Sequence, residues 1–516
     1  MILLRQGFDA DIGLLLEGTY PYVSGGVSSW IAQILRGFPD KRFAICFLGS
    51  RHSDYPRQNY ELPPQVVHCE AHFMHDADFT QTSDRTQNHR HSDPDVVAQL
   101  HALHRDYQET GVAQEPMDAL LAAHAAGRHG EYDLTMTQEA WTRITEHYRQ
   151  HCTDPSFIDY FWTVRIMHQP LWSLMRIAES FPKVGALHAV STGYAGMLGA
   201  IMKRRRRIPL ILTEHGIYTK ERKIDLFQAQ WIRDNRGLLE KDTGEVAYFR
   251  QMWIRFFEAL GRECYQQADP IIALYENNRQ RQISDGAPAE RTRNIPNGID
   301  LPRFSALYQR RPATPPAVIC LIGRVVPIKD IKTFIRAMRS IAYSLPQLQA
   351  WIAGPEDEDP AYASECRNLV RSSGLEEHVH FLGFQRIDEL LPKLGLIVLS
   401  SISEALPLVL LEGWAAGIPC VATDVGSCRQ LVEGLDAEDR AIGRAGRIVR
   451  IADPEGLGQA VVELMSDAAA WQAASAAGRR RVERYYTEAQ MFAAYRDIYT
   501  HALTTTAAQA EAPWPA

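Results

Sequence analysis

Two cationic side chains stand five positions apart, directly after an apolar run that is typical of a buried strand. Arg324 and Lys329 follow residues 318–322, whose sequence is Val-Ile-Cys-Leu-Ile. Sheets of the α/β class bind ligands at the carboxyl ends of their strands, so an arginine and a lysine placed here can converge on a diphosphate. A pair of solvated cations at a strand end is the alternative interpretation.

Two glutamates further along the chain offer a complementary chemistry. Glu404 and Glu412 are separated by seven residues, in a segment that reads as a turn followed by the start of a helix. Carboxylates accept hydrogen bonds from hydroxyl groups, and together with Arg324 and Lys329 they predict an enzyme that handles a nucleotide-sugar. On its own, Glu412 could be an acidic residue that complements the dipole at a helix N-terminus.

The length and composition of the chain indicate the class of protein to which these side chains belong. The chain has 516 residues, of which 46% are hydrophobic and 23% charged, and its formal net charge is -7. This length and composition predict an ordinary globular protein of two or more domains. The negative charge argues against nucleic acid as a main partner, because binding to a phosphate backbone requires a basic surface.

The cysteine pattern and the apolar runs indicate where the protein works. The eight cysteines are scattered, and no Cys-x-x-Cys pair occurs. We therefore expect reduced, mostly buried thiols and a cytoplasmic protein. The N-terminus lacks the long apolar stretch of a signal peptide, and no run approaches the roughly eighteen apolar residues that span a bilayer. Any association with the inner membrane is expected to be peripheral and to go through partners.

Two series of strands that alternate with helices are predicted. The first comprises residues 11–17, 43–48, 185–190, 209–213 and 270–274. The second comprises residues 318–322, 348–352, 378–382, 396–400 and 419–422. Such alternation predicts parallel, doubly wound sheets, and therefore an α/β protein.

The predicted domain boundaries follow from this alternation. Residues 1–305 form an N-terminal Rossmann-like domain, which a His-rich helical insertion interrupts near residues 75–180. Residues 306–480 form a C-terminal Rossmann-like domain, after turn residues and prolines that separate the two series. A C-terminal helix over 481–503 and a disordered tail over 504–516 complete the chain.

The order and spacing of several motifs resemble the family 4 glycosyltransferases, which are retaining nucleotide-sugar enzymes of GT-B architecture. The motifs are Tyr22-Val-Ser-Gly25-Gly26, Thr213-Glu-His215-Gly216, Ile295-Pro-Asn-Gly-Ile-Asp300, Gly323-Arg324 to Lys329-Asp330, Ala353-Gly354-Pro355, Phe381-Leu-Gly383-Phe and the pair Glu404 and Glu412. The likeness covers most of the chain except the insertion. Residues 17–30, with the insertion after them, resemble more narrowly the PelF-type glycosyltransferases of Pel exopolysaccharide assembly.

This resemblance implies a fold and an activity. The fold is two Rossmann-like domains that face each other across a cleft, with the last helix crossing back to the N-terminal domain. The activity is transfer of a hexose or N-acetylhexosamine, such as glucose from UDP-glucose, from a UDP-sugar in the C-terminal domain to an acceptor glycan in the N-terminal domain. No cofactor and no metal are implied, and the partners are membrane proteins of a polysaccharide synthase.

The resemblance also assigns roles to residues of the C-terminal domain. Arg324 and Lys329 contact the donor diphosphate, and Glu412 binds the ribose hydroxyls. Glu404 and the backbone N–H groups of Ala405 and Leu406 meet the sugar hydroxyls and the phosphate.

Five further residues complete the predicted site. By resemblance, Gly354 and Gly383 lie near the nucleotide base and His215 approaches the donor sugar. Gly25 and Gly26 stand between a strand and a helix start, where backbone N–H groups favour an anion. A plain tight turn at the glycines, and a core or capping role for His215, are the alternatives.

Other polar clusters are predicted to be solvated rather than metal-binding. His68, Glu70, His72 and His75 form one group, and His101 and His104 another, but neither matches the His-Glu-x-x-His pattern. The acidic run 356–359 is interpreted as a solvated loop. No metal site is predicted.

The basic run 203–207 allows two interpretations. Cations suit a helix C-terminus, so a solvated helix end is favoured. Docking on anionic lipid or on an acidic membrane partner is the alternative.

Two other functions remain open at this level. A sugar-nucleotide epimerase could share the fold, although no acid–base set facing the sugar can be matched. A non-enzymic donor-binding or scaffold subunit of a membrane polysaccharide synthase is the second alternative.

Overall fold

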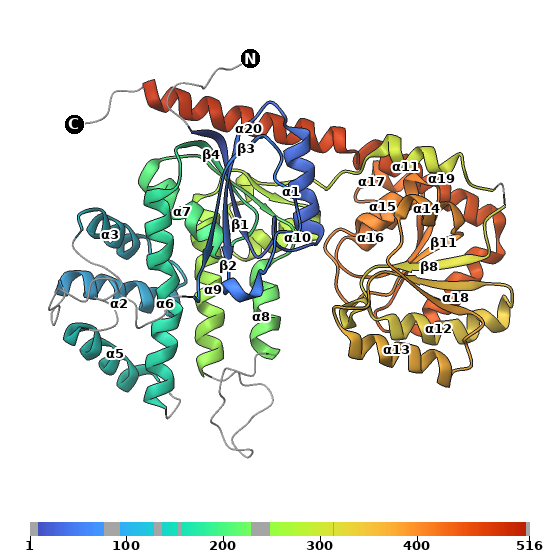
Figure 1. The fold of residues 1–516 in the computed structure, drawn as a ribbon, viewed down its shortest axis with the longest axis horizontal. Helices are drawn as coiled ribbons and strands as arrows, with labels where there is room; N and C mark the ends of the chain where they lie inside the picture. Colours follow the sequence, from blue (N-terminus) through green and yellow to red (C-terminus); the bar gives the residue numbers. More distant parts are fainter. Residues whose placement is uncertain are drawn as a thin grey trace. The chain divides into compact units, whose positions relative to one another are not determined.

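The computed structural model describes residues 9–76, 93–127, 137–152, 156–228, 248–312 and 314–511. The chain divides into two compact units (Figure 1). The N-terminal unit holds residues 1–273, 279–293 and 496–516, and the C-terminal unit holds residues 274–278 and 294–495. Each unit contains one sheet with helices packed against it, which confirms the predicted fold class.

The sheet of the N-terminal unit has seven strands in the order β3-β2-β1-β4-β5-β6-β7. The strands are β1 (Ala10–Glu17), β2 (Phe43–Gly49), β3 (Val66–Phe73), β4 (Val184–Ala189), β5 (Leu210–Glu214), β6 (Ile271–Ala273) and β7 (Thr292–Asn294). β1 pairs in parallel with both β2 and β4, so the strand order reverses there. In doubly wound sheets this switch point, at the carboxyl ends of the strands, is where ligands bind.

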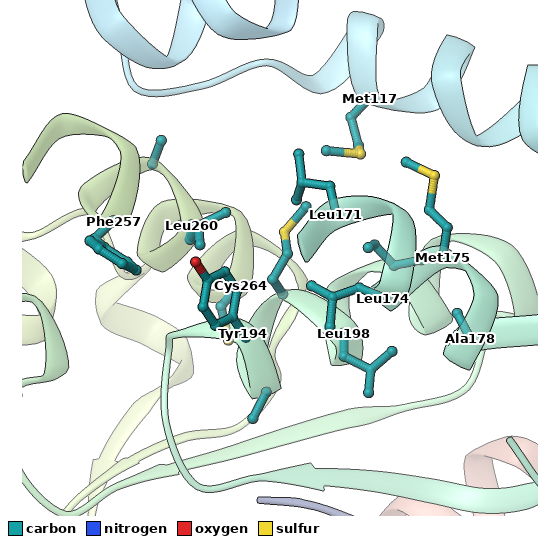
Figure 2. Packing of buried hydrophobic residues seen from close by; sticks show 14 of the residues in the cluster. Met117, Leu171, Leu174, Met175, Ala178, Tyr194, Leu198, Phe257, Leu260 and Cys264 are labelled. Atoms are coloured by element: carbon teal, nitrogen blue, oxygen red, sulfur yellow. The ribbon is translucent and has the colours of Figure 1, made fainter. Parts of the chain in front are cut away.

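Helices cover this sheet and form the insertion. They are α1 (Gly26–Gly37), α2 (Pro94–Glu109), α3 (Gln114–Ala125), α5 (Gln138–His151), α6 (Phe157–Ser180), α7 (Tyr194–Arg206), α8 (Tyr218–Gln228), α9 (Tyr248–Gln267) and α10 (Glu276–Ser284). The described parts of the insertion are helical as predicted, and two of their caps are encoded locally: the side chain of Asp93 accepts from Asp95 N and that of Ser156 from Asp159 N. Figure 2 shows Met117 of α3 and Leu171 and Met175 of α6 packed in one apolar cluster with Leu198 of α7.

The basic run at the end of α7 ties the insertion to the rest of the unit. Arg204 pairs with Asp118 of α3 (2.7 Å) and with Glu263 of α9 (2.9 Å), and the Glu263 side chain is almost completely buried. Arg205 pairs with Glu179 of α6 (2.8 Å), while Lys203 Nζ donates to Gln267 O (2.6 Å). The run is therefore not simply a solvated helix end, because Lys203, Arg204 and Arg205 are used inside the unit; Arg207 is exposed.

A buried pair of histidines lies within the insertion. His104 Nδ1 and His168 Nε2 are 2.8 Å apart, and His147 Nδ1 lies 2.6 Å from the hydroxyl oxygen of Tyr160. Burial is the largest cause that lowers the pKa of His168 and of His147, each to about 4. These rings are therefore neutral at physiological pH, and they act as packed hydrogen-bonding groups.

Acidification should destabilise the protein through these histidines. An unfolded histidine titrates near pH 6.5, so between pH 6.5 and 4 the unfolded chain binds more protons than the folded one, and stability falls as the pH falls. For His168 alone the loss at pH 5 is on the order of 2 kcal/mol. We expect His168→Leu to flatten the fall in Tm between pH 7 and 5, whereas the exposed-site change His501→Gln leaves it unaltered. Equal slopes in all three proteins would contradict this explanation.

The sheet of the C-terminal unit has six strands in the order β10-β9-β8-β11-β12-β13. The strands are β8 (Val318–Ile322), β9 (Gln349–Ala353), β10 (Val379–Gly383), β11 (Leu396–Leu399), β12 (Cys420–Thr423) and β13 (Gly446–Val449). The helices that follow the strands or precede them are α11 (Leu301–Tyr308), α12 (Ile331–Ser344), α13 (Pro360–Ser372), α14 (Ile387–Leu390), α15 (Leu408–Ala415), α16 (Cys428–Glu433), α17 (Ala437–Arg440), α18 (Pro454–Ser466) and α19 (Ala468–Tyr485). The strand order reverses between β8 and β11, which pair in parallel.

The last helix, α20 (Glu488–Glu511), contributes to both units. Its residues up to Tyr495 belong to the C-terminal unit and those from Arg496 to the N-terminal unit. The hydroxyl of Thr506 donates to Gly185 O (2.7 Å), and Thr506 is buried. The prediction of disorder from residue 504 is therefore wrong up to residue 511, because α20 continues to Glu511 and Thr506 packs on β4. Residues 512–516 lie outside the described part of the chain.

Within the described ranges, no helix combines the length and the apolar character needed to cross a membrane.

Candidate functional site

Lys329 and Glu404 meet at the switch point of the C-terminal sheet. Lys329 ends a short 3-10 turn after β8, and its Nζ lies 2.6 Å from Glu404 Oε1. Ser401 Oγ donates to the same carboxylate oxygen (2.6 Å). These residues come from the loops after β8 and β11, the two strands between which the order reverses. Sequence reasoning missed Ser401.

Backbone contacts hold the two loops together. Ser400 Oγ donates to Lys329 O (2.9 Å), and Ile402 N donates to Ile328 O (2.9 Å). Asp330 adopts a left-handed conformation and caps α12, its side chain accepting from Thr333 N (3.3 Å). Lys329 is therefore fixed at its backbone from both sides, which preorganises its ammonium group.

Glycines let the strand ends approach one another closely. A Cβ atom on Gly354 would lie 1.9 Å from Gly323 O, and a Cβ on Gly426 would lie 2.0 Å from Glu404 O. Gly354 N donates to Gly383 O (2.8 Å). Gly354 and Gly383 thus stand beside the loop of Arg324 and Lys329; their contact with a nucleotide base remains a prediction.

Arg324 lies at the same strand end but is paired differently. Its Nη1 lies 2.6 Å from both carboxylate oxygens of Glu358, and both side chains are half exposed. The acidic run 356–359 is therefore not simply solvated, since Glu356 also pairs with Arg367 (2.8 Å). Arg324 and Lys329, the two predicted diphosphate-binding residues, thus follow the same strand, but Arg324 pairs with Glu358 and Lys329 with Glu404.

Glu412 lies in the second turn of α15, not at its beginning. The helix starts at Leu408 because Pro407 precedes it, so Glu412 is too far along to complement the N-terminal dipole. Burial is the main cause that raises the pKa of Glu412 to about 7, while the charge of Arg303 opposes this shift. The Arg303 guanidinium itself pairs with Asp388 (2.9 Å).

The turn before α15 offers unused backbone donors. Among the described residues, no acceptor is found for the backbone N–H groups of Ala405 and Leu406, whereas Ala405 O accepts from Ser427 N (2.9 Å). Two free N–H groups that precede a helix are suited to bind an anion or a hydroxyl oxygen.

A pocket of about 940 Å³ occupies the switch point of the N-terminal sheet. Its walls come from the carboxyl ends of β1, β2 and β5 and from α8 and α9. The lining includes Glu17, His215, Tyr218, Arg222, Trp253 and Phe257. Aromatic faces combined with charged hydrogen-bonding groups suit a sugar ring, which has apolar faces and a polar rim.

His215 is buried on the wall of this pocket. Its ring packs edge-on against Trp30 (4.7 Å between centroids), and among the described residues no partner is found for Nε2. Burial lowers the pKa of His215 to about 3, so the ring is neutral. The preceding residue, Glu214, is a buried anchor whose carboxylate accepts from Tyr265 Oη (2.7 Å) and Tyr218 N (3.1 Å).

Glu17 lines the pocket but was not predicted as part of the site. Its carboxylate accepts from Tyr218 Oη (2.7 Å) and from Ala195 N (3.2 Å). The guanidinium carbon of Arg222 lies 5.1 Å from the Tyr218 ring centroid. The sequence does offer a signal for Glu17, because a charged residue ends the apolar run of β1. No feature of the sequence marks Tyr218 or Arg222 as pocket residues.

Gly25 and Gly26 begin α1 of the N-terminal unit and are exposed. An added Cβ at either position would meet nothing within 4 Å, so packing does not require these glycines. Their role in anion binding stays a prediction. Gly25, Gly26 and His215 belong to the N-terminal unit, whereas the other predicted residues belong to the C-terminal unit.

Two doubly wound units of this kind define the GT-B fold. The structure of Anabaena HepE, solved in complex with UDP, is similar over 95% of this chain and 100% of HepE, with a TM-score of 0.57 and 16% identity. The chain belongs to the family described as Domain of unknown function (DUF3492), whose model matches residues 10–290. Residues 316–467 match the model of the family described as Glycosyl transferases group 1.

Curated relatives match parts of the chain. An exopolysaccharide phosphotransferase of Streptomyces coelicolor is 33% identical over 39% of this chain and 20% of its own length. The lipopolysaccharide core biosynthesis mannosyltransferase LpsB of Rhizobium meliloti is 29% identical over 40% of this chain and 59% of its own. The chain thus spans less than two thirds of the length of these relatives.

Proposed function

We propose that this protein is a retaining glycosyltransferase that moves a hexose or N-acetylhexosamine from a UDP-sugar to a growing exopolysaccharide, with no metal required. The observation that carries this proposal is the constellation of Lys329, Glu404 and Ser401 at the switch point of a group 1 glycosyltransferase domain. A preorganised cation beside hydroxyl-binding groups is what departure of a nucleoside diphosphate from a sugar requires.

The C-terminal unit would hold the donor. Lys329 and Arg324 supply positive charge to the diphosphate, and Arg324 exchanges Glu358 for a phosphate oxygen. The N–H groups of Ala405 and Leu406 donate to phosphate or sugar oxygens, and Glu412 accepts from the ribose hydroxyls. UDP is proposed as the nucleotide part of the donor because HepE was solved with UDP and because the PelF-type resemblance favours it.

The N-terminal unit would hold the acceptor glycan in its pocket. Trp253 and Phe257 offer apolar surfaces, and Glu17 and Arg222 offer groups that bind hydroxyls. In the proposed reaction the acceptor hydroxyl oxygen forms a bond to the anomeric carbon as the bond to the donor phosphate oxygen breaks, on the same face. The hydroxyl proton passes to the departing phosphate, so the enzyme positions groups and stabilises charge without a covalent intermediate.

The finer assignment is to Pel-like exopolysaccharide synthesis, and so to biofilm formation, in the cytoplasm at the inner membrane. It rests on the resemblance of residues 17–30 to PelF-type enzymes, and the proposed partners are membrane proteins of a polysaccharide synthase. Since Lys203, Arg204 and Arg205 are paired within the protein, other surfaces would contact those partners.

Calorimetric titration combined with a transfer assay tests the proposal. The purified protein is titrated with UDP, UDP-glucose, UDP-N-acetylglucosamine, UDP-N-acetylgalactosamine and GDP-mannose, and again as Glu412→Ala. We expect one UDP-sugar to bind and to donate its sugar to an oligosaccharide, and Glu412→Ala to abolish both. Preference for GDP-mannose would overturn the choice of donor. An isomeric UDP-sugar formed without an acceptor would indicate an epimerase, and binding without transfer in the presence of an acceptor would indicate a scaffold subunit.

The affinity for UDP should depend on the ionisation of Glu412. Burial raises the pKa of this carboxyl group to about 7, and only the carboxylate can accept hydrogen bonds from both ribose hydroxyls. Protonation therefore competes with UDP, and affinity should fall about tenfold for each pH unit below 7. In Glu412→Gln the affinity should be low and much less dependent on pH between 8 and 6. An unchanged profile in this variant would remove Glu412 from the ribose site.

A further inference from the structure

Three side chains on the edge strand β3 form a hydrogen-bonded row. His68, Glu70 and His72 alternate along the strand, so their side chains point to one face of the sheet. His72 Nε2 lies 2.9 Å from Glu70 Oε1, and His68 Nε2 lies 2.8 Å from Glu70 Oε2. β3 was not predicted as a strand, and these residues were expected in a polar, exposed segment; the structure places them half-buried in a sheet.

The neighbouring strand adds a thiol to this row. Cys46 of β2 stands directly opposite Glu70 in the parallel register, and its side chain is completely buried. Cys46 Sγ, a carboxylate oxygen of Glu70 and a ring nitrogen of His72 all lie within 4.8 Å of one another. No motif in the sequence links Cys46 to this row, because the contact arises from strand pairing.

We propose that Cys46, Glu70 and His72 bind a divalent cation of the zinc type. Thiolate, imidazole and carboxylate are the ligands that zinc prefers, and ligand atoms around a tetrahedral zinc ion lie about 3.3–3.7 Å apart. Small rotations of Glu70 and His72, both partly exposed, bring the three atoms to that spacing. A water molecule takes the fourth position on the exposed side.

His68 would orient the carboxylate ligand. Its contact with Glu70 Oε2 leaves Oε1 turned toward His72, as a partner of a metal ligand does. On binding, the Cys46 S–H bond breaks, a sulfur–zinc bond forms, and the proton passes to solvent. Without a cation the same residues form a hydrogen-bonded network on an edge strand, and the experiment below separates these two states.

The cation would join β2 to β3 next to the pocket of the N-terminal unit. Beyond these strands, Met74 N donates to Gly49 O and His75 N to Ser50 O, both at 2.9 Å. Gly49, Ser50, Met74 and His75 all line the pocket. A bound cation would therefore stabilise one wall of the pocket. Its ligands include none of the proposed donor-binding residues, which belong to the C-terminal unit.

Cobalt titration of the chelator-treated full-length protein tests this site. A cobalt ion bound by a thiolate gives a sulfur-to-metal charge-transfer band, which we expect to saturate at one equivalent and to vanish when Zn²⁺ is added. Cys46→Ala should abolish the band. Cys69→Ser is the matched control, because Cys69 is adjacent to Glu70 but points to the opposite face, and it should keep the band.

Two surface variants keep the test valid if Cys46→Ala fails to fold. His72→Gln should weaken cobalt binding at least tenfold, and His68→Ala should weaken it 10–100-fold, as loss of a metal ligand's partner does. Zn²⁺ should raise the Tm of the wild-type protein more than that of His72→Gln. The proposal is overturned if no thiolate band forms, if the band survives Cys46→Ala or is lost in Cys69→Ser, or if His72→Gln binds cobalt as tightly as wild type.

Discussion

Replacing Lys329 with alanine should lower the rate of sugar transfer by about 10²–10³-fold, the usual effect of losing one preorganised group that stabilises a developing charge. The ammonium group lies 2.6 Å from Glu404 and is held by the backbone contacts of its turn. Without it, the leaving diphosphate loses a cation, and Glu404 loses its ion-pair partner. The rate is measured at saturating UDP-sugar with an oligosaccharide acceptor.

Lys332→Ala is the control for Lys329→Ala. Lys332 stands three positions further along, and its Nζ lies 2.6 Å from Glu365, so the change removes an ion pair of the same length. We expect this variant to retain wild-type transfer and a wild-type Tm. If Lys329→Ala retains full activity, or if both variants lose activity equally, the assigned role of Lys329 is wrong.

Replacing His215 with alanine should lower transfer by about 10²-fold while leaving the affinity for UDP unchanged. His215 lines the pocket of the N-terminal unit, and the donor residues belong to the other unit. Its buried ring, with a pKa of about 3, is neutral and acts by hydrogen bonding. The remaining pH dependence of the rate between pH 5 and 8 should therefore be the same in wild type and variant.

The experiment on His215 needs two readouts. Steady-state transfer gives the rate, and calorimetry with UDP gives the donor affinity; His501→Ala, an exposed change on α20, serves as the control. A large loss of UDP affinity in His215→Ala would place this residue in the donor site instead. Unaltered transfer would show that His215 is a core histidine packed on Trp30.

The central strands of both sheets could be predicted because their apolar runs are continuous. β1, β2, β8 and β11 are buried on both faces, and each is preceded or followed by turn residues. The edge strands β3, β7 and β13 were missed, whereas the fourth edge strand, β10, was predicted. Of the missed strands, β3 and β13 mix polar and apolar residues. An edge strand has a neighbouring strand on one side only, and the side chains of β3 and β13 are partly solvated, so no continuous apolar run is required.

The site residues were predictable only where a motif carried them. Lys329 and Glu404 do meet, whereas Arg324 pairs with Glu358, a residue assigned from sequence to a solvated loop. Ion pairs between loops depend on how the strand ends are stacked, and sequence spacing does not contain that information. For the same reason the run 203–207 was read as solvent-facing although Arg204 pairs with two other helices.

The division of α20 between the two units affects how the chain can be synthesised and folded. The hydroxyl of Tyr499 forms a hydrogen bond with His188 Nδ1 of β4 (2.8 Å), and its ring packs against Phe38 at the end of α1. The N-terminal unit therefore lacks part of its core until residues 496–506 have left the ribosome. Domains generally fold as units and the first one made folds first, but here the first unit to emerge is the last to be completed.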